Sequence, residues 1–430
     1  MKRRWLLGTL LLATCLALGA GTAFAQATEV KIGGIFPLTG SLASTGDEIR
    51  AGIQLAEDLI NNGAPGVDLE IAKWKGIPSL GNAKIKFLLA DHRGDPTRGA
   101  DLARRLIDDD KVAGILGSWM SSVTMSVSAI TERQGVPMLN SDSSSPALVR
   151  RGFKWFWHAN LHVEMFAGDV FKMLDYMVKE KVGGVQSKAD LDGVAILVEN
   201  TEWGMACKGV LEKAAKEYGY KLVEVVTYSH RAPDLASEVQ KVMGAKPNVV
   251  IMASYVSDAI LFTKTFKSMK FAPKVVMGFD GGFAEAGYIE ALGDDANNVM
   301  VIDHFFLSAM TKAKPVTAKV NEMYKQRANK DLTTASALGF TGAQIWAHVL
   351  NKAGKAEPAA VQKAFNELDL PGKEFIMPWT GVKFETFGGD TGQNRKVSAA
   401  VTQIQGGLRQ VVYPGEMGTA KMVYPFPQWK

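Results

Sequence analysis

Two patterns of apolar and polar residues alternate along the chain. Short, nearly continuous apolar runs such as 29–36 (EVKIGGIF) and 84–91 (KIKFLLAD) have the length and composition of buried strands. The stretches between them, such as 47–62 and the segment from Pro96, repeat apolar residues every three or four positions, as amphipathic helices do. Buried strands separated by such helices predict parallel sheets with helices on both faces.

A second series of the same kind begins at residue 193. It predicts strands over 193–200, 221–228 and 248–254, and helices from Trp203, near 234–244 and from Asp258. The segment 154–162 (KWFWHANLH) separates the two series. Because 430 residues exceed what one hydrophobic core usually serves, we expect two α/β domains.

The last third of the chain returns to long helices. A strand is expected over 299–306, followed by helices over 314–327 and 334–352. The tail, 381–389 and 396–414, alternates in the manner of antiparallel strands around a Gly406-Gly407 hairpin.

The N-terminal segment resembles a signal peptide. Residues 1–25 have three basic residues, an apolar middle and the small-residue ending Ala23-Phe24-Ala25. The alternatives are an uncleaved membrane anchor and a lipoprotein modified at Cys15. We expect cleavage before Gln26 and export to the periplasm.

Charge and cysteine content narrow the function classes. Three of the 49 basic residues lie in the first 25, so the mature chain would carry 46 against 44 acidic residues. A net charge of about +2 provides no electrostatic footprint for nucleic acid. Cys207 would be the only remaining cysteine, so no internal disulfide is expected.

Serine clusters follow two successive apolar runs, 112–116 and 136–139. Ser121-Ser122 comes after the first run and Ser143-Ser144-Ser145 after the second. Ligands bind at the carboxyl ends of parallel strands, where helix N-termini offer free N–H groups. The paired hydroxyls and N–H groups predict a cradle for a carboxylate or another polar head group. Ordinary helix N-capping by serine is the structural alternative.

Several motifs together resemble the leucine/isoleucine/valine-binding proteins. They are "VKIGGIFPLTGSLASTGDEIRAGIQLAEDLIN", "LGSWMSSVT", "SDSSSPAL", "NTEWGMACKG" and "GDTGQNRKVSAAVTQIQGG", in that order along the mature chain. The resemblance implies an α/β fold of two Rossmann-like lobes with parallel sheets joined by three hinge crossings, near 157–162, 299–304 and 376–384. The first lobe would comprise 26–159 plus 303–378, and the second 160–302 plus 379–430.

The resemblance also implies a function. The chain would be a monomeric periplasmic binding protein that closes on a branched-chain or other hydrophobic amino acid and delivers it to an inner-membrane ABC permease. No cofactor and no metal are expected. Ligands left open within the same fold are an aromatic carboxylate, an amide or urea.

Site residues follow from the same resemblance. Ser121 and Ser144 match the hydroxyls that hold the ligand carboxylate, with Ser122 and Ser143 beside them. Asp280 matches the acidic partner of the ligand ammonium, although it could also cap the following helix. The aromatics that would cover the ligand, unless they are core residues, are Trp203 and Tyr255.

Three positions depart from the family pattern. Thr45 stands where an aromatic is usual, and Trp119 is larger than expected. Asp142 replaces a small apolar residue beside the carboxylate site. Its charge would repel an anion by roughly 4 kcal/mol at a separation of about 4 Å and an effective dielectric of about 20. If Asp142 faces the ligand, an α-amino acid fits less well.

Two other function classes are disfavoured. The six histidines form no H-E-x-x-H pattern, no serine lies in a G-x-S-x-G elbow, and the glycines around 281–287 lack a P-loop lysine, so we do not expect an enzyme. A membrane-bound sensor would need a span after the domain, and 380–430 contains no run of about 20 apolar residues.

Overall fold

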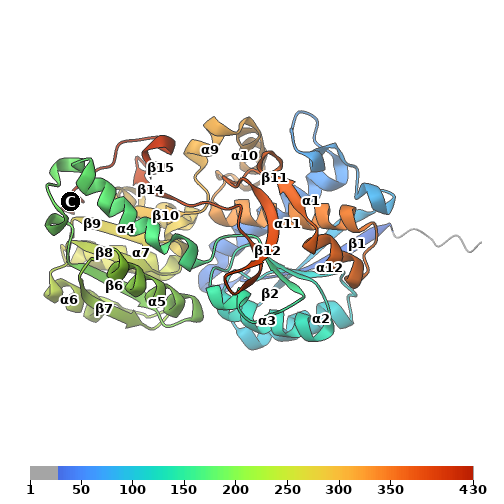
Figure 1. Cartoon of the computed structure of the whole chain (residues 1–430), viewed down its shortest axis with the longest axis horizontal. Coiled ribbons are helices and arrows are strands. Elements are labelled where there is room, and N and C mark those ends of the chain that lie inside the picture. Colours follow the sequence, from blue (N-terminus) through green and yellow to red (C-terminus); the bar gives the residue numbers. More distant parts are fainter. Residues whose placement is uncertain (1–27, 430) are drawn as a thin grey trace, which may run out of the picture.

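The computed structural model describes residues 28–429 and shows two lobes side by side (Figure 1). The expected signal peptide, 1–25, and Cys15 lie outside the described residues. The blue, cyan and orange parts of the chain form the first lobe, and the green and yellow parts form most of the second (Figure 1). None of the helices in 28–429 has the length and apolarity needed to cross a bilayer.

The first lobe is built on an eight-stranded sheet. Its strand order is β11-β12-β13-β5-β4-β3-β1-β2, with parallel pairing from β13 to β2 and antiparallel pairing among β11, β12 and β13. The strands are β1 (Glu29–Phe36), β2 (Lys84–Asp91), β3 (Ile115–Gly117), β4 (Met138–Asn140), β5 (Phe156–His158), β11 (Asp369–Pro371), β12 (Gly381–Phe387) and β13 (Asp390–Asn394). The helices are α1 (Ala43–Asn62), α2 (Pro96–Asp108), α3 (Ser121–Gln134), α10 (Pro315–Ala328), α11 (Thr334–Ala353) and α12 (Pro358–Asn366).

The second lobe has a seven-stranded sheet in the order β15-β14-β10-β9-β8-β6-β7. Its parallel core ends in an antiparallel β14-β15 hairpin around Gly406-Gly407, as expected from the sequence. The strands are β6 (Val194–Glu199), β7 (Leu222–Tyr228), β8 (Val249–Ala253), β9 (Val275–Phe279), β10 (Met300–Asp303), β14 (Ala400–Gln405) and β15 (Leu408–Tyr413). The helices associated with this sheet are α4 (Val163–Lys179), α5 (Glu202–Glu217), α6 (Ala236–Ala245), α7 (Val256–Ser268) and α8 (Ala286–Leu292). Helix α9 (Leu307–Ala313) follows the crossing after β10 and contacts both β15 of this lobe and α10 of the first.

Helix α11 is the central element of the first lobe. Its residues from Thr334 to Leu350 are all buried, and it packs closely on α1. A Cβ on Gly52 would lie 2.2 Å from the Ser336 carbonyl oxygen, so the two helices cross at backbone contact. The segment 63–83 packs against α11 as well, where Trp74 meets His348 edge to face at 5.3 Å.

The chain passes between the lobes three times, as expected, but the third crossing lies elsewhere. The first follows β5, the second follows β10, and the third spans 395–399 between β13 and β14. The family resemblance places the third near 376–384 and assigns 379–430 to the second lobe. That assignment is wrong for β12 and β13, because Gly388-Gly389, with φ of 60° and 92°, turns the chain back into the first sheet.

Candidate functional site

A small cavity lies between the two lobes. Loops that follow strands of both sheets supply most of its walls, because the carboxyl ends of the strands meet there. Helix α11 supplies the remaining wall. The lining residues are Trp119, Asp142, Ser144, Trp203, Tyr255, Asp280, Gly281, His304, Thr334 and Leu338.

Six of the ten residues predicted from the sequence line this cavity. The structure brings together first-lobe and second-lobe candidates that are up to 161 residues apart, as between Trp119 and Asp280. Their contact with a ligand remains a prediction. The six are Trp119, Asp142, Ser144, Trp203, Tyr255 and Asp280.

The other four predicted residues do not line the cavity. Ser121 begins α3, as expected, but its Oγ accepts a hydrogen bond of 3.3 Å from the Ser145 N–H. Ser143 Oγ is 2.6 Å from Thr124 Oγ1, inside the loop. Thr45 is buried in α1 and donates to Glu285 of the second lobe, and Ser122 is half-buried in the first turn of α3.

Asp142 faces the cavity and also organises the loops around it. Its Oδ1 accepts from the Trp119 N–H at 2.8 Å and from the Ser143 N–H at 3.0 Å. These donors belong to the two loops that we expected to cradle a ligand carboxylate. Burial raises the pKa of Asp142 to about 6, although the backbone hydrogen bonds oppose the rise.

Asp280 enters the cavity from the end of β9. Burial raises its pKa to about 7, while the N–H of Gly281 and the Ser144 side chain lower it. The nearest basic group is His304 Nε2, at 3.9 Å from Oδ2. Burial lowers the pKa of His304 to about 4, so this imidazole is neutral at pH 7 and does not neutralise Asp280.

Backbone strain occurs at two of the lining residues. Trp119 has φ of 68° and Asp280 has φ of 59°, in the left-handed region that non-glycine residues seldom adopt. Such residues cost about 1–3 kcal/mol and are concentrated at functional sites. Nine further non-glycine residues outside the lining also have positive φ, so the strain shows that these two backbones are tightly held and does not by itself mark the site.

Aromatic side chains form a wall of the cavity on the second lobe. Trp203, in the first turn of α5, and Tyr255, just before α7, stack with ring centroids 5.1 Å apart and an interplanar angle of 27°. Both are buried, at 3% exposure each, although they face the cavity. Trp119 adds an indole from the first lobe.

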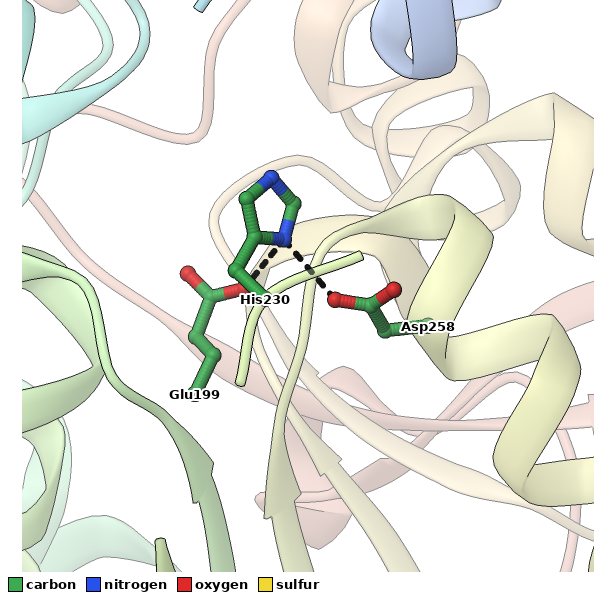
Figure 2. A group of neighbouring side chains, drawn as sticks. All are labelled: Glu199, His230 and Asp258. Atoms are coloured by element: carbon green, nitrogen blue, oxygen red, sulfur yellow. Dashed lines mark hydrogen bonds and ion pairs between the residues drawn. The ribbon is translucent and has the colours of Figure 1, made fainter. Parts of the chain in front are cut away.

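A charged cluster of Glu199, His230 and Asp258 lies next to Tyr255. In this cluster His230 Nδ1 points between the two carboxylates (Figure 2). Nδ1 is 2.8 Å from Asp258 Oδ2 and 3.3 Å from Glu199 Oε2. Burial alone would lower the pKa of His230, but the two carboxylates outweigh it and raise the pKa to about 9. These three side chains could ligate a divalent cation, and a protonated His230 satisfies the same carboxylates.

The imidazole of this cluster also supports the aromatic wall. The rings of His230 and Tyr255 meet edge to face, with centroids 5.2 Å apart. Glu199 ends β6, and Asp258 lies in the first turn of α7. The cluster therefore ties three neighbouring strand ends to the residue that covers the cavity.

Polar contacts between the lobes hold the cleft closed. Ser145 Oγ donates to Glu202 Oε1 at 2.7 Å, and the Ala286 N–H donates to Glu48 Oε1 at 3.2 Å. Thr45 donates to Glu285 nearby. Burial raises the pKa of Glu285 well above its usual range, and the adjacent Glu48 carboxylate adds to the rise.

Sequence reasoning missed four lining residues and the charged cluster. The motifs that carry the family resemblance do not point to Gly281, His304, Thr334 or Leu338. His304, however, follows a strand at the carboxyl edge of the sheet, the criterion that selected the serines. Glu199, His230 and Asp258 satisfy the same criterion.

Two kinds of comparison place the chain among known proteins. The profile of the periplasmic binding protein family matches residues 29–407. A curated relative, the Leu/Ile/Val-binding protein homolog 7 of Brucella abortus, is 27% identical over 413 residues, which cover 95% of this chain and 97% of the relative.

Solved structures show the same fold at lower identity. A branched-chain amino acid transporter substrate-binding protein of Streptococcus pneumoniae, in complex with isoleucine, has a TM-score of 0.72 at 19% identity, covering 92% of this chain and all 100% of that one. A solute-binding protein of an ABC transporter from R. palustris, in complex with 4-hydroxybenzoate, has a TM-score of 0.70 at 17% identity and covers 94% and 98%. With two α/β lobes, three crossings and a cavity between them, the chain belongs to the periplasmic binding protein family.

Proposed function

We propose that this chain is the solute-binding protein of an ABC importer, and that it captures a small ammonium-bearing solute with an apolar or aromatic body. Residues 1–25 direct its export to the periplasm, and the closed lobes present the solute to an inner-membrane permease. The protein acts as a monomer without a cofactor and performs no catalysis. Hydrophobic amino acids are the class that its relatives' names suggest.

The observation that carries this proposal is Asp280. Asp280 is 7% exposed and lines the interlobe cavity, and among residues 28–429 the basic group within 4 Å of its carboxylate is the neutral imidazole of His304. A buried carboxylate is costly unless it is paired, and a ligand ammonium supplies the missing charge. A solute that touches both Asp280 and the first-lobe loops would stabilise the closed state by its differential affinity.

A thermal-shift screen of the purified protein tests the proposal. The panel contains leucine, isoleucine and phenylalanine, their deaminated acids, their amides, 4-hydroxybenzoate and urea. A ligand present at a hundred times its Kd adds about 2.7 kcal/mol of stability, which is readily detected. If amine-bearing solutes stabilise the wild type but not Asp280→Asn, Asp280 pairs with the ligand ammonium. If Asp280→Asn loses stabilisation by amines and by plain acids equally, that role is contradicted.

An aromatic carboxylate is the second candidate solute. Three aromatic side chains, Trp119, Trp203 and Tyr255, line the cavity. The R. palustris protein of the same fold was solved with 4-hydroxybenzoate. This alternative predicts that 4-hydroxybenzoate stabilises the protein and that Asp280→Asn does not weaken the effect.

A further inference from the structure

The carboxylate of Asp142 occupies the place between the loops after β3 and β4 where a ligand carboxylate was expected to bind. The N–H groups of Trp119 and Ser143 follow adjacent strands, β3 and β4, and both donate to Asp142 Oδ1. Ser121, the other expected carboxylate contact, is turned to the Ser145 N–H. These two N–H donors are therefore used within the protein, and of the two expected hydroxyls only Ser144 lines the cavity.

Among residues 28–429, those that line the cavity include no side chain with a fixed positive charge. Its lining contains two carboxylates, Asp142 and Asp280, and neither lysine nor arginine. The one basic lining residue, His304, is buried, and burial keeps its pKa near 4. A solute carboxylate placed beside Asp142 would meet a like charge in a low-dielectric site, whereas a cation would meet two opposite charges.

The aromatic walls suit the same kind of solute. An ammonium or other organic cation within about 6 Å of an indole or phenol face gains cation–π attraction, more when both are desolvated. Trp119 approaches from the first lobe, and the stacked Trp203–Tyr255 pair from the second. Acidic groups and aromatic side chains on both sides of the cleft are complementary to a cation with an apolar body.

We propose that Asp142 takes the place of a solute carboxylate, so that the site selects organic ammonium cations that have no carboxylate beside the ammonium. Amines and amino acid amides belong to this class, and free α-amino acids do not. This inference rests on the proposed solute-binding function and specifies its substrate class. Asp142 is then a specificity-determining residue that acts by charge and by occupying the loop donors.

Calorimetric titration with three matched solutes tests the inference. Leucine, leucinamide and 3-methylbutylamine share the side chain and the nitrogen but differ in the carboxylate. The wild-type protein should bind leucinamide and 3-methylbutylamine at least about tenfold more tightly than leucine. Asp142→Asn keeps an Oδ1 acceptor for the two N–H groups and removes the charge, so the preference should fall by about tenfold or more. Thermal unfolding verifies that the variant folds.

A matched control is Asp68→Asn, because Asp68 is an acidic residue of the first lobe with 96% of its side chain exposed. This variant should retain the wild-type preference. Tighter binding of leucine than of leucinamide by the wild-type protein would overturn the inference and leave the solute-binding function intact. A preference that is unchanged in Asp142→Asn would also overturn it. If no amine or amide binds but 4-hydroxybenzoate does, the cationic solute class is refuted and the solute-binding function stands. If no solute of the panel binds, the proposed function is refuted as well.

Discussion

The hydroxyl of Ser145, in the loop after β4, donates a 2.7 Å hydrogen bond to Glu202 Oε1, in the first turn of α5. The two residues lie on opposite lobes and 57 positions apart. Their contact can form only when the cleft is closed. Since a hydrogen bond to a charged group contributes about 1.5–3 kcal/mol net, Ser145→Ala should weaken solute binding about tenfold or more.

Calorimetry with whichever solute the thermal screen identifies would measure this loss. Ser237→Ala removes a hydroxyl at an exposed position of α6, where the partner is the adjacent Glu238, and it should bind as the wild type does. Equal affinity of Ser145→Ala and wild type would show that the Ser145–Glu202 hydrogen bond does not contribute to closure.

Glu285 should make closure of the ligand-free protein depend on pH. Burial between the lobes raises its pKa, the Glu48 carboxylate adds to the rise, and Thr45 and Arg409 oppose it. Because the closed state favours the protonated acid, its stabilisation is present at low pH and is lost as pH rises through the raised pKa. Small-angle scattering should show a larger radius of gyration at pH 8 than at pH 5.

Glu285→Gln should flatten that dependence, because the amide is neutral at both pH values. Glu416→Gln changes an exposed acid in a short turn near the C-terminus and serves as the control. A pH dependence that persists unchanged in Glu285→Gln would assign it to another group.

His230 should stabilise the fold in a pH-dependent way. Its pKa is raised to about 9 by Asp258 and Glu199, against an unfolded value of about 6.5. The contribution is therefore fully present below about pH 6.5 and is lost as pH rises through about 9. At pH 7 it amounts to at most about 3 kcal/mol.

Chemical denaturation at pH 7 and at pH 9.5 would measure this effect. The difference in unfolding free energy between wild type and His230→Gln should shrink over that interval. A constant difference would mean that His230 contributes through packing against Tyr255 rather than through its charge.

Binding of an organic cation should strengthen as pH rises. The pKa values of Asp142 and Asp280 are raised by burial to about 6 and about 7, and a cation favours their ionised forms. Affinity for 3-methylbutylamine should increase about tenfold or more between pH 5 and pH 8, where His304 does not titrate. In Asp142→Asn only the increase in affinity caused by ionisation of Asp280 should remain. An affinity of the wild-type protein that does not change with pH would contradict the roles of both carboxylates.

Much of the fold was predictable because the patterns that specify it are local. The expected strands 29–36 and 84–91 coincide with β1 and β2, since apolar runs and flanking turn residues define both ends. Ser121 begins α3, as the loop pattern indicated. The position of β12 and β13 was not predictable in this way, because their place depends on pairing with β5, far away in the chain.

The site was predictable only in part, for a similar reason. Ser121 and Ser144 occupy equivalent places after successive strands, yet only Ser144 lines the cavity. The difference arises from how the two loops pair with each other, through the hydrogen bond from the Ser145 N–H to Ser121. Spacing along the sequence places a residue at a strand end, but the contacts between loops decide where its side chain points.

The order of strands in the first sheet has a consequence for the synthesis of the protein. Strand β5 is covered on one side by β13, whose Gln393 pairs with His158 from a position 235 residues later in the chain. At about 5–20 residues per second, the ribosome needs about 10–50 s to supply the missing neighbour. Until then β5 cannot complete its pairing, and a strand that lacks its neighbour is prone to pair with other chains. A chaperone or export factor that binds extended segments has this interval in which to engage the nascent polypeptide.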